Sequence, residues 1–505
     1  MLENLGPAIA SLLDLQVLGL IIVGVIVGII GGALPGITAT VTVALVLPLT
    51  FQLEPVLALA TLAAVYMAAE FGGSISAILI NTPGTPAAIC TALDGFPMAR
   101  EGRAHEALNV AVIASSIGGV LGVLVLLFFT PPLAEFSLRF GSAEQFWMAI
   151  AGLSIVCTLT ADNFTKGVIS ASIGLFIAGI GTDPVSSFHR FTFNILAMED
   201  GINLIPAALG LFAVPQMLIL ISSKDGIVEE LRPQPGAFLK AFSYTMKRPS
   251  LLLRSSFIGV LIGILPGAGA GIASFVSYGE AKRISKEVRK FGEGNPEGIV
   301  ASESANNAMV GGSLVPLLAF GIPGSPSAAI LFGALTINGF VPGPSLFNEN
   351  AEVTYAFMMS FFPAIAFMLL FGIFGARAFA SVLKLDRAFI ISTVLLLAVI
   401  GSYSARSDMA DVYIMVAFGL LGFGLTKFGF SIAPVILGLI LGPMAEEGFR
   451  RSLDIGNIQG SVWPYFFGRP LSVILIMVTA LMVFAAFWQE AKRKGKNKQD
   501  LSIEG

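Results

Sequence analysis

Two short segments of the sequence could bind a polar solute through their main chain. Asn-Thr-Pro-Gly-Thr-Pro occupies residues 81–86 and Gly-Ile-Pro-Gly-Ser-Pro occupies residues 321–326, each directly after a long apolar run. Proline has no main-chain donor and glycine weakens a helix, so both segments should interrupt the helices that carry them. An interrupted helix presents amides that attract a carboxylate and carbonyls that can hold a cation. We therefore expect a solute-binding site at the two interruptions.

Glycines and short polar side chains near the interruptions complete the candidate site. Local roles compete with binding: threonines near residue 40 could bond to their own helix, Ser74 could be a packing residue, and a Pro-Gly pair could merely kink a helix. Recurrence of the motif in the second half of the chain favours the binding interpretation. We assign substrate binding to Thr38, Ser74, Asn81, Thr82, Gly84, Thr85, Gly269, Asn306, Asn307, Gly324 and Ser325.

Ionisable residues inside apolar runs are functional candidates, because a charge is costly within a membrane. Glu70 lies in the run Ala-Ala-Val-Tyr-Met-Ala-Ala-Glu-Phe, and Glu303 precedes two adjacent asparagines. A hydrogen bond from Glu70 to a freed amide is the structural alternative to a coupling role. We expect a candidate Na⁺ or H⁺ site whose full ligand set the sequence does not name, and assign cation coupling to Glu70, Pro35, Gly36, Pro266 and Gly267.

The composition predicts a helical membrane protein. Of the 505 residues, 55% are hydrophobic and 12% are charged, whereas a soluble domain has roughly 25% charged residues. The apolar runs at residues 110–129 and 471–488 are long enough to cross a bilayer as helices. The alternating strands of an outer-membrane barrel are not evident. We expect an all-α polytopic membrane protein with about 10–12 membrane segments, each a helix or re-entrant element.

The chain contains an internal duplication. Residues 33–42 resemble residues 264–273, the block that begins at Gly72 resembles the block that begins at Gly311, and a Gly-Phe pair follows each block. Three matching blocks in the same order indicate a repeat. We place its two halves at residues 15–222 and 250–445.

The distribution of cations predicts that the two halves have opposite orientations. The loop at residues 282–290 is cationic, and its counterpart at residues 47–55 has no Lys or Arg. The bias reverses after the second motif, where the first half has Arg100 and Arg103. Cytoplasmic loops are enriched in cations, so equivalent loops should face opposite sides, as in many secondary transporters. Scatter over few charges is the alternative, because the loops predicted to be external contain Arg139, Arg190 and Arg450.

This topology gives boundaries along the chain. The segments around Pro35-Gly36 and at residues 266–271 should form the tips of re-entrant hairpins, and residues 83–86 and 323–326 should interrupt discontinuous helices near the middle of the membrane. We expect a first repeat at residues 1–222, a cytoplasmic linker at 223–249, an inverted second repeat at 250–445, an external loop and C-terminal membrane helix at 446–490, and a basic cytoplasmic tail at 491–505.

Long motifs of the chain resemble the large membrane subunit of the tripartite tricarboxylate transporter family, the TctA type. They include GGALPGITATVTVALVLPLTF from Gly31, GGSISAILINTPGTPAAICTALDGFPMAREGRA from Gly72, GTDPVSSFHRFTFN from Gly181, and the segments from Asp200, Gly263 and Glu303. Two departures are visible: Gly321-Ile322 replaces the Asn-Thr pair of the first half, and the loop at residues 267–271 has no hydroxyl side chain.

The resemblance implies secondary uptake of a citrate-like carboxylate with Na⁺ or H⁺ coupling. It implies three components: this subunit, a small four-helix membrane subunit and a periplasmic solute-binding protein. The location would be a bacterial inner membrane, with the C-terminus in the cytoplasm. Two opposed re-entrant hairpins would suit an elevator-type movement, which is an inference from the fold class.

Other functions receive less support from the sequence. A permease for another organic acid or small solute is the nearest alternative, and a passive channel is a second. A zinc protease needs a second histidine that the sequence HEALN lacks, and a primary pump needs a Gly-Lys-Ser type nucleotide loop. We therefore expect no enzyme activity and no cofactor apart from the coupling cation.

Overall fold

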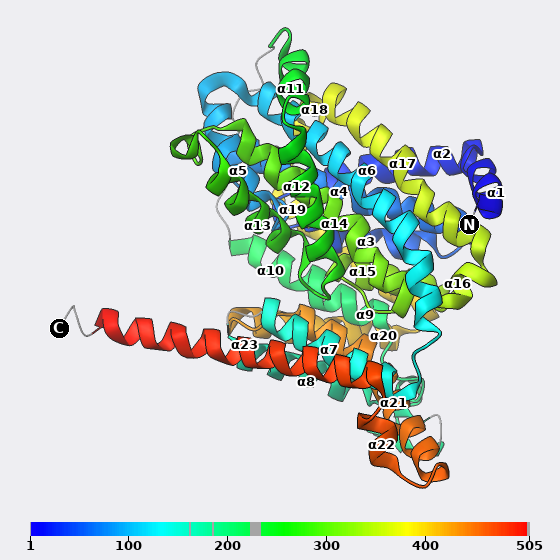
Figure 1. Ribbon diagram of the computed structural model, residues 1–505. Coiled ribbons are helices and arrows are strands. Elements are labelled where there is room, and N and C mark those ends of the chain that lie inside the picture. Colours follow the sequence, from blue (N-terminus) through cyan, green and yellow to red (C-terminus); the bar gives the residue numbers. More distant parts are fainter. Residues whose placement is uncertain (1, 161–162, 184–185, 223–233, 502–505) are drawn as a thin grey trace. The chain divides into compact units, whose positions relative to one another are not determined.

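The computed structural model describes residues 2–160, 163–183, 186–222 and 234–501 (Figure 1). Asp162, which the sequence suggests as a helix cap, lies outside these residues. In the described chain the only β-structure is the antiparallel pair β1 (Gly181–Thr182) and β2 (His189–Arg190). The structure is therefore all-α, as the composition predicts.

Nine described helical segments are long and apolar enough to cross a membrane, and four shorter apolar helices accompany them. The chain is a multi-pass membrane protein. The nine segments are Leu15–Ala33, Pro55–Ile80, Ala88–Ser137, Ser142–Leu159, Leu204–Ile221, Ala351–Phe374, Arg387–Arg406, Met409–Lys427 and Pro470–Trp488.

The chain folds into two compact units, and each unit draws on both halves of the sequence repeat. The first unit comprises Met1–Glu135 and Ala208–Phe423, and the second comprises Phe136–Ala207 and Gly424–Gly505. The four repeated Pro-Gly motifs, at residues 35–36, 83–86, 266–267 and 323–326, lie in the first unit. The candidate site therefore belongs to this unit alone.

The first unit contains most of the helices, and α6, α9 and α20 each run across its boundary. Its elements are α1 (Leu2–Leu12), α2 (Leu15–Ala33), α3 (Ala39–Val46), η1 (Leu47–Thr50), α4 (Pro55–Ile80), α5 (Ala88–Met98), η2 (Ala99–Arg103), α6 (Ala104–Ser137), η4 (Leu209–Ala213), α10 (Val214–Ser222), α11 (Ala237–Met246), α12 (Pro249–Ile264), α13 (Gly269–Ile284), η5 (Val288–Lys290), α14 (Pro296–Phe320), α15 (Pro326–Ile337), α16 (Pro344–Asn348), α17 (Ala351–Phe374), α18 (Ala376–Val382), α19 (Arg387–Arg406) and α20 (Met409–Lys427).

Glycines bring two pairs of helices into close contact in this unit. On α2, a Cβ at Gly28 would lie 2.6 Å from the carbonyl oxygen of Val65 on α4. On α12, a Cβ at Gly259 would lie 2.3 Å from the carbonyl oxygen of Ala305 on α14. Membrane helices pack closely where such small residues let their backbones approach. The α2–α4 pair and the α12–α14 pair are thus built in the same way.

Each half of the repeat shows the helix interruptions that the sequence predicts. A break separates α2 from α3 and another separates α12 from α13, and Gly36 (φ 83°) and Gly267 (φ 72°) adopt left-handed conformations there. A second break separates α4 from α5 and α14 from α15. The positive φ angles at Gly36 and Gly267 favour glycine, which explains its place in the first Pro-Gly motif of each half.

The interrupted helices differ from the predicted half-helices in their lengths. At a rise of about 1.5 Å per residue, the 26-residue α4 and the 25-residue α14 are each long enough to cross the roughly 30 Å hydrocarbon core. The helices after the breaks are short, with 11 residues in α5 and 12 in α15. Length alone therefore does not place the interruptions at the middle of the membrane.

The second unit is built around the long helix α21 (Ala433–Ile458). Its elements are α7 (Ser142–Thr160), α8 (Phe164–Ala178), β1, β2, η3 (Leu196–Met198), α9 (Leu204–Ala208), α21 (Ala433–Ile458), α22 (Val462–Phe467) and α23 (Pro470–Leu501). Close approach at Gly174 and Gly438 packs α8 against α21. The Glu144 carboxylate on α7 accepts hydrogen bonds from Ser472 and from the main chain of Gly141, and it pairs with Arg469 at 2.8 Å.

Helix α21 continues through residues that the sequence places in an external loop. The helix runs past Pro443 to Ile458. Ion pairs at a spacing of four residues, Arg450 with Glu446 and Arg451 with Glu447, support this polar part of the helix. The true loop between α21 and α23 is correspondingly shorter.

Candidate functional site

Both Pro-Gly segments fold back onto the helices that they end. α4 ends with Asn81 in a left-handed conformation (φ 52°), and α14 ends with Gly321 in the same region (φ 73°). The amide of Gly84 then donates to the carbonyl of Gly73 (3.4 Å), and the amide of Gly324 donates to that of Ser313 (3.1 Å). The two interruptions therefore have equivalent main-chain geometry.

We call the helix pair α2–α3 the hairpin of the first half and the pair α12–α13 the hairpin of the second half. Gly84 and Gly324 contact α2 and α12 of these hairpins so closely that no side chain would fit. A Cβ at Gly84 would lie 1.9 Å from the carbonyl oxygen of Gly32 on α2. A Cβ at Gly324 would lie 2.1 Å from the carbonyl oxygen of Gly263 on α12. Each interruption is thus held against the hairpin of its own half.

A cluster of buried hydroxyl groups joins the two halves at the second interruption. Tyr66 on α4 shares hydrogen bonds with Ser313 (3.1 Å) and with Ser325 (2.8 Å), the residue that caps α15. Thr40 on α3 shares a hydrogen bond of 2.9 Å with Ser327 in the first turn of α15. All five side chains are buried. We call Thr40, Tyr66, Ser313, Ser325 and Ser327 the hydroxyl cluster.

The first interruption meets the opposite hairpin in a comparable way. A Cβ at Gly271, in the first turn of α13, would lie 3.2 Å from the Cβ of Pro86. Each interruption therefore contacts the hairpin of the other half as well as its own. This arrangement brings the four helix interruptions, at residues 35–36, 83–86, 266–267 and 323–326, into one region of the first unit.

A second buried polar group lies along α4 and α14. The Asn306 amide donates to the carbonyl of Glu70 (3.1 Å), and the Asn307 amide donates to the carbonyl of Met67 (3.1 Å). The side-chain oxygens of both asparagines are buried and have no hydrogen-bond partner in the described part of the chain. Because an unpaired buried acceptor costs free energy, each of these oxygens is a candidate to accept a hydrogen bond from a solute or to coordinate a cation.

Glu303 lies one turn before Asn306 on α14 and is fully buried. Its carboxylate accepts hydrogen bonds from Ser115 on α6 (2.8 Å) and from Thr91 on α5. The Glu70 side chain is only 5% exposed. The structure thus places two acidic side chains in the interior of the first unit, on helices that are bonded to each other.

The other predicted residues have mixed environments. Thr85 is 2% exposed, and its buried hydroxyl has no partner among the described residues. Thr38 caps α3 by accepting from the amide of Val41, and Ser74 donates to the carbonyl of Phe71 in its own helix. Both therefore have the local roles that the sequence left open.

Asn81 is exposed and Thr82 is half-buried with its hydroxyl bonded to the carbonyl of Ile80. Gly269, the first residue of α13, has φ 68°. A Cβ added at Gly269 would lie 3.9 Å from the Cδ atom of Pro326. Pro35 is half-buried and Pro266 is buried at the hairpin breaks. Within the described chain, no group of three His, Cys, Asp or Glu side chains could hold a metal ion.

Comparison with known proteins identifies the family. Residues 18–437 match the model of the tripartite tricarboxylate transporter TctA family. The chain belongs to this family. It is also similar to two proteins of Agrobacterium vitis: the "Uncharacterized 52.8 kDa protein in TAR-I ttuC' 3'region", 32% identical over 89% of both chains, and the "Uncharacterized protein in TAR-II ttuC' 3'region", 32% identical over 47% of this chain and 96% of the relative.

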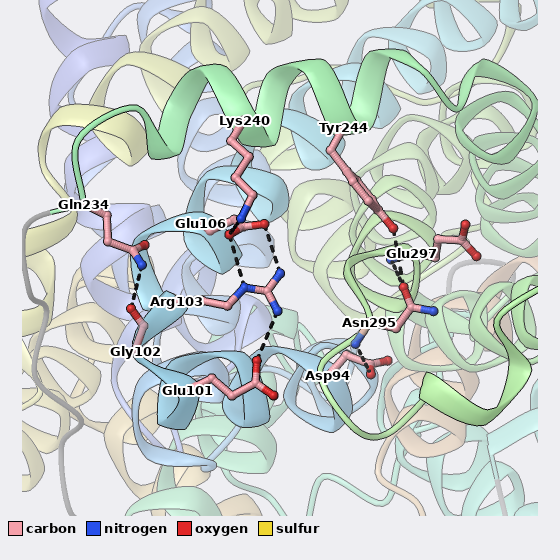
Figure 2. Close-up of polar contacts among 10 residues, drawn as sticks. All are labelled: Asp94, Glu101, Gly102, Arg103, Glu106, Gln234, Lys240, Tyr244, Asn295 and Glu297. Atoms are coloured by element: carbon pink, nitrogen blue, oxygen red, sulfur yellow. Dashed lines mark hydrogen bonds and ion pairs between the residues drawn. The ribbon is translucent and has the colours of Figure 1, made fainter.

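In this TctA-family chain, Asp94 ties the first interruption to the second half. Its carboxylate accepts from the amides of Gly292 (2.8 Å), Gly294 (3.1 Å) and Asn295 (2.8 Å), and from the hydroxyl of Tyr278 (2.8 Å). Figure 2 shows Asp94 directed at the main chain of Asn295. The Asp94 carboxylate therefore fixes the loop before α14.

Sequence reasoning missed several side chains of this TctA-family site. Tyr66 precedes Glu70 by four residues, one helical turn, and is the only hydroxyl-bearing aromatic in an alanine-rich run. That spacing places Tyr66 on the same helix face as Glu70 and could have identified it as a site residue. Thr91, Ser115 and Ser327 gave no such signal, because their partners come from other helices.

Proposed function

We propose that the chain is the large membrane subunit of a binding-protein-dependent secondary transporter that imports a tricarboxylate or a similar organic anion. Membership of the TctA family supports this proposal. The observation that carries it is the convergence of four helix interruptions, two from each half, around buried hydroxyl groups. Interrupted helices inside a membrane protein are the usual site of solute and ion binding in secondary transporters.

A carboxylate suits the groups available at the interruptions. The N-terminal ends of α5 and α15 present main-chain amides, which carry partial positive charge. The hydroxyls of Ser325 and Thr85 adjoin these ends and can donate hydrogen bonds. The substrate would be held mainly by main-chain amides and hydroxyls, so the binding protein would be a second source of selectivity.

Glu70 is the proposed coupling residue. It is buried on α4, and its main-chain carbonyl is held by Asn306, one turn from Glu303. A buried carboxylate in a membrane segment can accept a proton or ligate Na⁺. The carbonyls freed at Pro35-Gly36 and at Pro266-Gly267 would add oxygen ligands for the cation.

The proposed assembly has two further components, a small membrane subunit with four helices and a periplasmic solute-binding protein. The chain would lie in the inner membrane of a bacterium with its C-terminus in the cytoplasm. Transport would involve movement of the hairpin-bearing part of the first unit in an elevator-type cycle. These elements come from the family resemblance and from the predicted orientation of the two halves.

Reconstitution tests the proposal directly. Proteoliposomes that contain this chain with its small subunit should take up labelled citrate, or a labelled dicarboxylate, when the binding protein is added and a Na⁺ or pH gradient is imposed. Counterflow of labelled substrate should also occur. Uptake without counterflow and without dependence on either gradient would favour a passive channel.

Two side-chain truncations locate the substrate site. Thr85→Ala and Asn81→Ala should abolish uptake while membrane insertion stays normal, because each removes a polar group at the first interruption. Thr336→Ala is a matched control, since that exposed hydroxyl bonds only to carbonyls of its own helix. Normal uptake in both Thr85→Ala and Asn81→Ala would contradict the assigned site.

A further substitution tests coupling apart from substrate binding. Glu70→Gln keeps the shape of the side chain but removes its charge, so it should change the dependence of uptake on Na⁺ or pH. An unchanged cation dependence would remove Glu70 from this role and leave the substrate assignment intact.

A further inference from the structure

Helix α11 (Ala237–Met246) exposes two chemically different edges. Its inner face is buried against the first unit and consists of Ala237, Ala241 and Thr245, at a spacing of four residues. At about 100° per residue, the remaining surface divides into two stripes. One stripe is apolar and exposed: Phe238, Leu239, Phe242 and Met246. The other is polar and exposed: Lys240, Ser243 and Lys247.

Polar contacts hold α11 in place on the first unit, as Figure 2 shows. The Lys240 ammonium lies 2.7 Å from the Glu106 carboxylate, which also pairs with Arg103 at 3.0 Å. Before the helix, the Gln234 amide donates to the carbonyl of Gly102 (2.7 Å). The inner face and the near side of the polar stripe are therefore fixed to the start of α6.

The C-terminal end of α11 is fixed to the start of α14. The Tyr244 hydroxyl lies 3.4 Å from the Asn295 side chain (Figure 2). Arg248 pairs with Glu297 at 3.0 Å. The Arg248 guanidinium stacks on the Tyr244 ring, 3.6 Å from its centre. Because both ends are anchored, the exposed apolar stripe cannot turn inward to bury itself.

The apolar stripe of α11 exposes large hydrophobic side chains next to its lysines. Leu239 is 69% exposed and Phe242 is 45% exposed. The same pattern resumes in α12, where Leu253, Phe257 and Leu261 form an exposed stripe at four-residue spacing. α12 is one of the short apolar helices of this membrane protein, so its exposed stripe has acyl chains as the natural solvent.

We propose that α11 lies in the membrane–water interface, with Phe238, Leu239, Phe242 and Met246 among the lipid acyl chains and Lys240, Ser243 and Lys247 towards water and lipid headgroups. An interfacial helix has an apolar edge rich in Phe and Leu beside a polar edge rich in Lys. A helix that carries these two edges and a third, protein-bound face fits the boundary of a bilayer beside a membrane protein.

Charge next to the helix identifies anionic lipid as the occupant. Ser285 donates to Glu297 at 2.6 Å, so the cationic segment that contains Lys286, Arg289 and Lys290 begins beside the anchored end of α11. Basic residues near the bilayer surface attract anionic headgroups. A second protein on the same apolar stripe would have to cover this cationic neighbourhood as well.

Nitroxide accessibility in vesicles tests the proposal. Single cysteines at Phe242 and Met246 report on the apolar edge, and cysteines at Ser243 and Lys247 report on the polar edge. Phe257→Cys on α12 is the lipid-facing control. The background is Cys90→Ala with Cys157→Ala; the wild-type background under mild labelling is a second route, since both native cysteines are buried. The labelled chain is reconstituted alone in vesicles of phosphatidylcholine and phosphatidylglycerol.

The expected result is a reversal between neighbouring positions. Labels at 242, 246 and 257 should collide more with oxygen than with a water-soluble nickel chelate, and labels at 243 and 247 should show the opposite preference. Preference for the nickel chelate at 242 and 246 would place the apolar edge in water and overturn the proposal. Protection of 242 and 246 from both reagents would show that protein covers the edge, and would overturn it as well. Neither readout depends on transport.

Discussion

The two glycines that press each interruption against its hairpin should be equally intolerant of a side chain. The perturbation is Gly84→Ala in one variant and Gly324→Ala in another. The added Cβ would lie 1.9 Å from the carbonyl oxygen of Gly32 in the first case and 2.1 Å from that of Gly263 in the second. The two substitutions therefore create the same clash at equivalent positions of the repeat.

The size of the effect follows from these distances. Ordinary van der Waals contact of such a Cβ begins at 3.4 Å, so the interruption must retreat from its hairpin by more than 1 Å in each variant. Neither neighbour can move aside alone, because it is helix backbone. Overpacking of this kind destabilises a protein by about 1–3 kcal/mol. Displacement of binding groups by roughly 1 Å can lower a rate about 100-fold.

The native cysteines provide the stability assay. Cys90 is buried on α5, directly after the first interruption. In a Cys157→Ala background, a thiol-reactive fluorophore reports the temperature at which Cys90 becomes accessible in detergent. Both glycine variants should unfold at lower temperature than the parent, by similar amounts, and uptake should fall by about two orders of magnitude in each.

A matched substitution controls for the change of residue type. A Cβ at Gly279 on α13 meets nothing within 4 Å, and alanine is the better helix former by up to about 1 kcal/mol. Gly279→Ala should therefore leave the transition unchanged or raise it. The reasoning is refuted if Gly84→Ala or Gly324→Ala unfolds like Gly279→Ala, or if only one of the two is affected.

Substitutions at three further positions have expected outcomes. Asp94→Ala should lower the free energy of unfolding by several kcal/mol, because three main-chain amides lose their acceptor at about 1–3 kcal/mol each. Asp94→Asn should lower the free energy of unfolding less, because the side-chain carbonyl oxygen of asparagine can still accept hydrogen bonds from these amides. Tyr66→Phe should change the unfolding temperature little, because Ser313 and Ser325 keep local partners, yet it should reduce uptake in the reconstituted assay. Arg450→Gln should increase proteolysis of the segment that contains β1 and β2, because it removes two hydrogen bonds of 3.0 and 2.6 Å to the buried Asp183 carboxylate.

The sequence predicts the main features of the first unit because they depend on local chemistry. Two prolines separated by a glycine and a short polar residue are poorly tolerated in a helix, so the breaks at residues 81–87 and 321–325 follow from residue type, whereas the single Pro316 stays inside α14. The duplication predicts that similar breaks occur in both halves. The burial of Cys90 and Cys157 likewise follows from their apolar surroundings.

Other features could not be read from the sequence because they depend on contacts between distant segments. Glu303 is paired with side chains from α5 and α6, and Asp94 is paired with a loop about 200 residues away in the chain. The helical part of α21 after Pro443 was missed for another reason. Its charged residues resemble a loop in hydropathy, and only their four-residue spacing indicates a helix.

The helix breaks occur in both halves of the chain, but the polar side chains around them differ between the halves. When Gly84 is aligned with Gly324, as their equivalent contacts require, Tyr66 corresponds to Asn306 and Glu70 corresponds to Val310. Glu303 corresponds in the same way to Ala63, so the two halves carry different side chains at all three positions. Yet these unmatched residues bond to one another across the halves: Tyr66 bonds to Ser313, and Asn306 bonds to the main chain of Glu70.

This asymmetry separates two requirements of the site. The repeated prolines and glycines set the course of the backbone, and any substitution there should affect both halves alike. The unmatched polar residues supply the chemistry, and each is present once. A change at Glu70 or Glu303 therefore cannot be compensated by its counterpart in the other half, because Val310 and Ala63 are apolar. Changes in substrate or in coupling cation among related chains should consequently concentrate at these unmatched positions and leave the paired glycines unaltered.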